Sequence, residues 1–303
     1  MNSINFESGS VIVGKWGNKK YRIKKQIGFG GIASVYLVED TKTNCLYALK
    51  ISKDNLSINR EYRLLKKFAT VDMIVNIHEI DDFHINGDIY YFIVLEYIDG
   101  YNLKDYIQKN KININIIIGI MIILMEGIDL FHRQGYIFAD LKPENIMIDR
   151  KNKYIKIIDL GGVVKKGSGI KEFTPAYDRA SWKCGDRIAE PSYDIFSIMM
   201  IFTKMILAED INPRKQSMKD IIIKIRNSSI EDYLKKYIIS GLIDGYISLF
   251  HSSMKLRELY NLNILDRKAK REESINRKID YFVFFSIGIF IYTIIFIFCF
   301  NNI

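Results

Sequence analysis

Cysteine, proline and histidine are all scarce in this 303-residue chain, and their scarcity excludes several classes of protein. The three cysteines, Cys45, Cys184 and Cys299, are too widely spaced for a disulfide scaffold or a zinc-type pair, and they fit a reducing compartment. Four scattered His argue against a histidine-rich metal site. With 49% hydrophobic residues and only 4 Pro, the chain is not disordered, collagenous or of low complexity. Its length allows one large domain or two lobes.

The sequence also lacks a concentrated basic patch. Its net charge is +9, but residues 266–280 combine six basic side chains with four acidic ones, and the remaining excess is spread thinly. No Lys/Arg stretch alternates with aromatic residues as a nucleic-acid groove requires, so nucleic acid is not expected as a partner.

The one long hydrophobic segment is at residues 281–300, which hold no charged side chain and are long enough to cross about 30 Å of hydrocarbon. The alternative, a buried core helix, would show a polar stripe, and only Ser286, Gly288 and Thr293 interrupt the bulky apolar residues. A single-pass anchor is therefore expected. The basic residues before it predict, by the positive-inside rule, that the N-terminal part is cytoplasmic. Residues 1–10 lack the basic and apolar regions of a signal peptide.

A second apolar stretch, residues 116–125, is only ten residues long and is flanked by Asn113, Asn115 and Glu126. It is too short to span a membrane, so a buried helix is expected there.

The pattern of hydrophobic residues changes along the chain. Short β-type runs with Gly or Asn breaks predict antiparallel strands in 11–51, 76–83 and 89–97, with an amphipathic helix at 57–68. After Gly100, helices are expected at 103–109, 114–133, 192–208, 218–227 and 230–250, around a loop-rich stretch from 136 to 190. The sequence thus predicts an α+β fold of two lobes joined near residues 96–100, with a ligand cleft between them.

Residues 28–35 (GFGGIASV) fit the glycine-rich pattern G-x-G-x-x-G-x-V, except that Ala33 stands at the third glycine. Glycines there let backbone N–H groups approach a phosphate closely. A glycine-bearing hairpin turn explains the run equally well on its own. A strand rather than a helix follows, which argues against a dinucleotide-binding fold.

Lys50 lies in an otherwise apolar strand, and Glu61 on the next helix is a candidate partner for its charge. For either residue alone, a solvated face remains the commoner explanation.

Two further loops carry polar groups at the ends of short predicted strands. Residues 140–145 (DLKPEN) precede one strand, and Asp159 follows another. Asn145 and Asp159 are the oxygen ligands that Mg²⁺ takes when substrate phosphates complete its shell. Asp140 is then available to accept the proton of an attacking hydroxyl.

These motifs, in this order and with a later D-I-F-S-I at 194–198, resemble the eukaryotic-like (Hanks-type) serine/threonine protein kinase family, bacterial branch, over about residues 21–265. The resemblance implies a two-lobed kinase fold with an antiparallel β N-lobe to about 97 and a mostly helical C-lobe over 98–265. Residues 1–20 precede this domain, a basic juxtamembrane segment occupies 266–280, and a C-terminal transmembrane helix occupies 281–300 in the bacterial cell membrane.

The resemblance also assigns roles to residues. It makes Asp140 the catalytic base, Lys142 the lysine that steadies the transferred phosphoryl group, and Asn145 and Asp159 the Mg²⁺ ligands. Asp194 would brace the catalytic loop, and residues 174–177 would dock the substrate. The implied ATP-binding residues are Ile27, Gly28, Gly30, Ala33, Val35, Ala48, Lys50, Glu61, the backbone of Glu96 and Ile98, and Met147. The implied activity is Mg²⁺-dependent transfer from ATP to a Ser or Thr hydroxyl of a protein.

Besides Ala33 at the third glycine and Leu160 in place of the Phe of D-F-G, which is a mild change, the chain departs from the family pattern in two motifs. Phe138-Ala139-Asp140 replaces H-R-D, so no arginine can bind a phosphorylated activation loop, and activity is expected not to depend on that contact. Phe138 is expected to pack beside Leu65 and Leu160. Residues 179–181 (RAS) replace A-P-E, which removes the acid that normally anchors the docking segment.

These losses keep a second hypothesis open, a pseudokinase or nucleotide-binding scaffold. Retention of both Asp140 and Asp159 favours the hypothesis of an active kinase over that of a pseudokinase. Homodimerisation through the span is also left open, because its small residues form no clean small-xxx-small pair.

Overall fold

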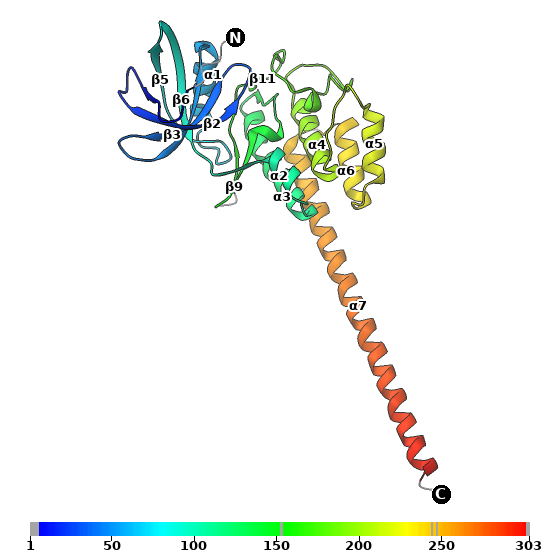
Figure 1. The fold of residues 1–303 in the computed structure, drawn as a ribbon. Coiled ribbons are helices and arrows are strands. Elements are labelled where there is room, and N and C mark those ends of the chain that lie inside the picture. Colours follow the sequence, from blue (N-terminus) through cyan, green and yellow to red (C-terminus); the bar gives the residue numbers. More distant parts are fainter. Residues whose placement is uncertain (1–5, 152–153, 244, 247, 301–303) are drawn as a thin grey trace. The chain divides into compact units, whose positions relative to one another are not determined.

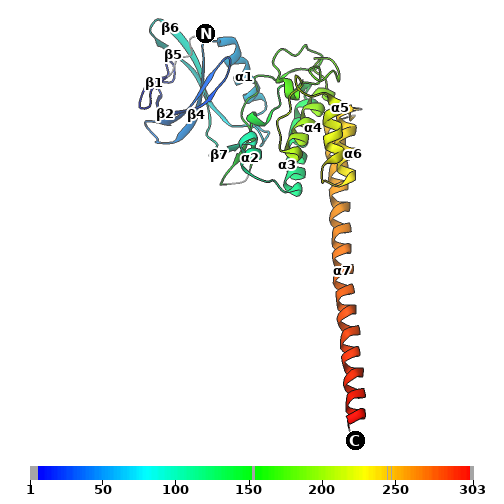
Figure 2. The ribbon, with the colours of Figure 1, turned by 45° about the vertical axis from the view of Figure 1, so that its right-hand side comes forward.

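The computed structural model describes residues 6–151, 154–243, 245–246 and 248–300, although the side chains of 263, 265–271, 280, 283–284 and 286–300 are outside this description. The chain divides into two units, residues 1–253 and 254–303. The first unit contains a β-rich lobe and a helical lobe, which lie side by side in both Figure 1 and Figure 2. The two-lobed α+β arrangement predicted from the sequence is confirmed.

The β-rich lobe is a six-stranded antiparallel sheet with the strand order β1-β2-β3-β4-β6-β5. Its strands are β1 (Val11–Val13), β2 (Lys20–Phe29), β3 (Ser34–Asp40), β4 (Leu46–Ser52), β5 (Ile77–Ile85) and β6 (Asp88–Glu96). Alternate residues of these strands form one apolar cluster that includes Tyr21, Tyr36 and Phe92. Helix α1 (Asn55–Lys67) begins at Asp54, whose side chain accepts a hydrogen bond from the amide of Ser57.

The helical lobe begins after Asp99. Its helices are α2 (Leu103–Lys109), α3 (Ile114–Arg133), α4 (Pro191–Leu207), α5 (Met218–Asn227) and α6 (Asp232–Ile243). The loop-rich stretch before α4 contains the short elements β8 (Tyr136–Ile137), η1 (Pro143–Asn145), β9 (Ile146–Asp149), β10 (Ile155–Ile157), β11 (Val164–Lys165) and η2 (Pro175–Tyr177). The strands of this stretch and β7 (Gly100–Asn102) form two small antiparallel sheets, β10-β9-β7 and β11-β8, whereas η1 and η2 are short 3-10 helices.

Helix α3 is the one helix of the described residues that is long and apolar enough to cross a membrane. It is mostly buried within the lobe, where Met121, Leu124, Met125, Ile128 and Phe131 are inaccessible to solvent. The prediction of a buried helix around residues 116–125 is therefore confirmed.

The predicted single helix over 230–250 is wrong. Helix α6 ends at Ile243, a new helix α7 begins at Leu249, and Gly245 between them has φ +68°. A backbone in the left-handed region cannot continue a right-handed helix. Helix α7 runs from Leu249 to Phe300. The predicted membrane span belongs to this helix, and most of its side chains lie outside the described residues.

The adjacent residues Leu124 and Ile123 test whether α3 is a core helix. Leu124 is fully buried, whereas the side chain of Ile123 is 46% exposed. We expect Leu124→Ala to lower the free energy of unfolding by about 2–5 kcal/mol through lost burial and cavity formation. The control Ile123→Ala should change it by only about 0.5 kcal/mol. Urea denaturation of both variants measures the difference, and equal losses would contradict the assignment.

Candidate active site

The glycine-rich segment is the hairpin between β2 and β3. Gly28 pairs with Val35 across this hairpin, and the amide of Gly30 donates to the carbonyl of Ala33 at 2.9 Å. The side chain of Ile27, just before the turn, is 42% exposed. Together these contacts form the tight hairpin that the sequence predicted at this position.

The register of the sheet brings three predicted ATP-binding residues to one face. Val35 of β3 lies opposite Lys50 of β4, and Leu37 lies opposite Ala48. Because alternate residues share a face, Val35, Ala48 and Lys50 point to the same side of the sheet. That side bears α1, since the ammonium of Lys50 contacts the carboxylate of Glu61.

Lys50 joins the two lobes electrostatically. Its Nζ lies 2.7 Å from Oε2 of Glu61 and 3.1 Å from Oδ1 of Asp159, in the helical lobe. Burial disfavours charge on this lysine, but the two carboxylates outweigh burial and raise the pKa of Lys50. Burial also raises the pKa of Glu61, against the attraction of Lys50. For Asp159, burial opposes ionisation, but Lys50 and the amide of Gly161 lower its pKa.

The segment between the lobes contains the two predicted adenine-binding residues. The amide of Glu96 donates to the carbonyl of Asn76 at 2.9 Å, so that amide is already committed within the protein. The carboxylate of Glu96 accepts from the Asn76 side chain at 2.9 Å. Ile98 is buried, and Met147, on β9, is half-buried. The amide of Glu96 is therefore engaged within the protein, and the predicted adenine contact of this residue through that amide is not supported.

The loop that carries Asp140 is held by a buried carboxylate on α4. Asp194 is fully buried and accepts hydrogen bonds from the amide of Phe138 (2.7 Å) and the amide of Ala139 (2.8 Å). Its Oδ2 also lies 2.8 Å from Nε2 of His132. Ala139 has φ +65°, a conformation that costs a residue with a Cβ about 1–2 kcal/mol. The bonds to Asp194 compensate for this strain, and Asp140 follows directly.

The carboxylate of Asp140 is contacted on both oxygens. Lys142 Nζ lies 2.5 Å from Oδ2, and the hydroxyl of Thr174 donates to Oδ1 at 2.8 Å. The side-chain amide of Asn145 is 3.5 Å from the carbonyl of Asp140. The structure thus brings the predicted base, its lysine and the first residue of the predicted docking segment together.

Asn145 and Asp159 both carry side-chain oxygen atoms, which are the donors that a hard divalent cation binds. Lys50 and the amide of Gly161 lower the pKa of the Asp159 carboxyl, and Asn145 is buried and carries a side-chain oxygen. In the described part of the chain, no three His, Cys, Asp or Glu residues gather as a metal-binding group. Such a pair suits an ion whose shell is completed by phosphate oxygens and water.

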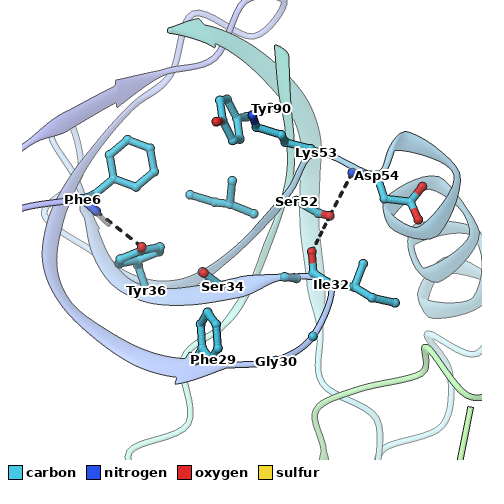
Figure 3. Close-up of a pocket in the computed structure, with 13 residues that line it drawn as sticks. Phe6, Phe29, Gly30, Ile32, Ser34, Tyr36, Ser52, Lys53, Asp54 and Tyr90 are labelled. Atoms are coloured by element: carbon cyan, nitrogen blue, oxygen red, sulfur yellow. Dashed lines mark hydrogen bonds between the residues drawn. The ribbon is translucent and has the colours of Figure 1, made fainter. Parts of the chain in front are cut away.

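A pocket of about 530 Å³ touches the glycine-rich hairpin from the opposite face (Figure 3). Phe6, Phe29, Tyr36 and Tyr90 surround it, and Ile51 points into the same face. Since Ile51 follows Lys50 in the strand, the two side chains project to opposite sides of the sheet. This pocket is therefore separate from the site that contains Lys50 and Asp140.

Comparison with known proteins agrees with this geometry. The family described as "Protein kinase domain" matches residues 21–259. The chain belongs to the protein kinase family. It is 34% identical to the serine/threonine-protein kinase YabT of Bacillus subtilis (strain 168) over 250 residues, which is 80% of this chain and 72% of that protein. The enzyme is accordingly a protein serine/threonine kinase.

Other relatives are matched over a smaller part of their length. The serine/threonine-protein kinase PrkC of the same organism is 36% identical over 50% of this chain and 24% of its own length. A probable serine/threonine-protein kinase of Clostridium perfringens is 33% identical over 88% of this chain and 42% of its own length.

The phenylalanine that replaces the histidine of H-R-D is part of an aromatic series between the lobes of the kinase. Phe138 is buried, and its ring packs edge-on against Phe131 with the centroids 5.7 Å apart. Phe131 in turn stacks on Phe68, at the end of α1, at 3.8 Å. Leu65 and Leu160 are fully buried, and the predicted contact of Phe138 with these two residues stays a prediction.

Two residues that position the active site were not predicted from the sequence. A Cβ at Gly162 would lie 2.7 Å from the Cβ of Asp140, so only glycine fits there. The second glycine of the run Asp159-Leu160-Gly161-Gly162 was the available signal. Arg60, beside Glu61 on α1, donates to the carbonyl of Val163 at 2.5 Å. No local pattern indicates that contact, because 103 residues separate its partners.

Asp194→Asn tests the role of the buried carboxylate. The amide group of Asn would face one of the two backbone N–H donors and leave it without an acceptor. We expect a loss of about 1–3 kcal/mol in unfolding free energy, and a drop of roughly tenfold or more in phosphotransfer with ATP affinity retained. Calorimetry measures the unfolding free energy, a transfer assay measures the rate, and a nucleotide-binding assay measures ATP affinity. The control Asp232→Asn alters a carboxylate that is 86% exposed and should change nothing; wild-type transfer by Asp194→Asn would contradict the role.

Proposed function

We propose that this kinase transfers the γ-phosphoryl group of ATP to a Ser or Thr hydroxyl of a protein substrate, with Asp140 as the base. The observation that carries the proposal is the pair of ion contacts from Lys50 to Glu61 and Asp159. It links the β-rich lobe, α1 and the helical lobe through one ammonium group. Catalysis of phosphoryl transfer is mostly positioning and charge stabilisation, and these residues supply both.

Each residue then has a defined task. Lys50 would bind the α- and β-phosphates, beneath the hairpin of Gly28, Gly30 and Ala33. Asn145 and Asp159 would hold Mg²⁺, which when bound supplies positive charge to the phosphates. Asp140 would orient the acceptor hydroxyl and take its proton, while Lys142, already beside that carboxylate, would neutralise charge on the transferred group.

The alternative is a pseudokinase that binds partners without transfer. It is weakened by the ion contact of Asp159 with Lys50 and by the contacts of Asp140 with Lys142 and Thr174, which a module without catalysis has no physical reason to keep.

The direct test incubates the full chain with γ-labelled ATP, with and without Mg²⁺. We expect label on protein only with Mg²⁺. Asp140→Asn and Asp159→Asn should each abolish it, because the first removes the base and the second removes the negative charge of a metal ligand, while both preserve side-chain shape. Circular dichroism and thermal melting check that both variants fold. Asp232→Asn serves as the exposed control. Unchanged labelling in either active-site variant would contradict its assigned role, and an unlabelled wild type would favour the pseudokinase.

We also propose that residues 281–300 anchor the enzyme in the bacterial cell membrane by a single pass, with the kinase domain in the cytoplasm. The segment holds no charge over twenty residues. The side chains described at its start are exposed aromatic ones, with Tyr281, Phe282 and Phe285 at 71%, 73% and 68%. Aromatic residues at this level suit a membrane interface.

The anchor predicts that the full chain sediments with membranes and resists extraction at high pH. The double variant Ile289→Arg/Ile291→Arg should become extractable, because each central arginine costs about 2.5–3.5 kcal/mol. The matched control, Ile223→Arg/Ile243→Arg, changes two exposed isoleucines of the kinase domain and should remain with the membrane. A wild-type chain found in the supernatant would contradict the anchor.

A second experiment tests on which side of the membrane the kinase domain lies. If the domain is cytoplasmic, a membrane-impermeant maleimide should label the exposed Cys45 only after the cells are lysed.

A further inference from the structure

The segment that follows Thr174 lacks the acid of A-P-E, yet a different acid in it is fully buried. Asp178 comes directly after η2 and is inaccessible to solvent. A buried carboxylate is costly unless several donors satisfy it. The donors around Asp178 therefore show what the carboxylate holds together.

Asp178 receives hydrogen bonds from three parts of the lobe. Within its own turn, the amide and hydroxyl of Ser181 donate to Oδ2 at 3.0 and 2.6 Å. From the segment before α4, Arg187 contacts the same oxygen through Nε at 2.9 Å and Nη2 at 2.8 Å. From α4 itself, the buried hydroxyl of Tyr193 donates to Oδ1 at 2.8 Å. Although burial opposes ionisation, the bonds from Ser181, Arg187 and Tyr193 lower the pKa of Asp178.

Arg187 extends this cluster toward the active site. Its guanidinium carbon lies 4.0 Å from the centre of the Phe173 ring, close enough for a cation–π contact. Phe173 is followed by Thr174, whose hydroxyl donates to Asp140. The chain of contacts thus runs from Asp178 through Arg187 and Phe173 to the neighbour of the catalytic base.

Helix α4 holds the same segment at a second point. The hydroxyl of Ser197 donates to the carbonyl of Tyr177 at 2.8 Å. Tyr193 and Ser197 are one helical turn apart, so both reach the segment from one face of α4. Residues 174–178 are therefore attached to α4 at both Tyr177 and Asp178.

We propose that Asp178, through its ion pair with Arg187, is the positioning residue of the substrate-docking segment 174–177. Asp178 attaches this segment to the rest of the helical lobe, which is the role that the acid of A-P-E has in the family. This inference rests on the proposed transfer to a protein hydroxyl. It concerns acceptance of the protein substrate rather than binding of ATP, because none of the residues in the cluster belongs to the predicted nucleotide site.

Three variants of the full chain test the pair, namely Asp178→Asn, Arg187→Gln and the double variant. Asp186→Asn is the matched control, since this neighbouring acid is exposed. Arg187→Gln keeps the pair testable if Asp178→Asn does not fold. The arginine side chain is 40% exposed, and after its replacement Tyr193 and Ser181 still donate to the Asp178 carboxylate. The measurements are KM and kcat with dephosphorylated casein as acceptor, Kd for ATP, and amide hydrogen exchange over residues 174–182.

We expect both single variants to lower kcat/KM for casein by roughly tenfold or more, mainly through KM, with the Kd for ATP within about twofold of wild type. Amides of 174–182 should exchange faster, by about tenfold, while those of β3 and β4 do not change. Because the two residues act through one interaction, kcat/KM for casein should be only slightly lower in the double variant than in the more impaired single variant.

The proposal fails if exchange over 174–182 is unchanged in both single variants, if ATP affinity falls in parallel with casein turnover, or if the two losses multiply in the double variant. It also fails if neither single variant folds, because Asp178 would then be a general stability residue. Hydrogen exchange does not require turnover, so a wild-type chain without kinase activity would refute the proposed function while the exchange result still decides the role of Asp178.

Discussion

The buried carboxylate of Asp194 is the constraint on which the active site depends. It binds two successive amides, those of Phe138 and Ala139, and so holds Ala139 in a left-handed conformation that a residue with a Cβ avoids. The direction of the chain into Asp140 follows from that conformation, and Gly162 lets the next segment pass against the backbone and Cβ of Asp140. A carboxylate inaccessible to solvent can play this part only while its donors stay in position. The catalytic loop and the first turn of α4 therefore form or break together.

The departures of this kinase from the family pattern lie around this constraint and leave it intact. Replacement of histidine by Phe138 keeps an apolar ring in contact with Phe131, and so keeps packing continuous toward α1. Replacement of arginine by Ala139 removes a cation but not the amide that Asp194 binds. The groups that we propose to contact a nucleotide or a hydroxyl lie on other residues, so the loss of both side chains is compatible with a formed site. Arg60 adds a link from α1 to the segment after Asp159 that does not require a phosphate.

Much of this architecture could be predicted from the sequence because it is encoded locally. Helices α2, α3 and α5 match the predicted ranges, since hydrophobic periodicity and the flanking Asn and Ser caps define them. The pairing of Lys50 with Glu61 followed from a charge placed in an apolar strand. The break between α6 and α7 was missed because a glycine is also tolerated inside helices, and only its positive φ interrupts this one. The role of Asp178 was missed for a different reason. Its partners Arg187 and Tyr193 lie nine and fifteen residues away, one in the irregular segment before α4 and one on α4, and no periodicity relates them to Asp178.

The position of these contacts on α4 has a mechanical consequence. Tyr193, Asp194 and Ser197 lie within its first two turns, and they hold Asp178, the catalytic loop and Tyr177 respectively. The proposed base and the proposed docking segment are thus attached to one rigid element, which places the hydroxyl of Thr174 within hydrogen-bonding distance of Asp140. Both carboxylate oxygens of Asp140 already have a neighbour, Lys142 on one and Thr174 on the other. The acceptor hydroxyl that we propose for this site would therefore approach Asp140 between two groups whose positions are set by the catalytic loop and by the segment attached to α4.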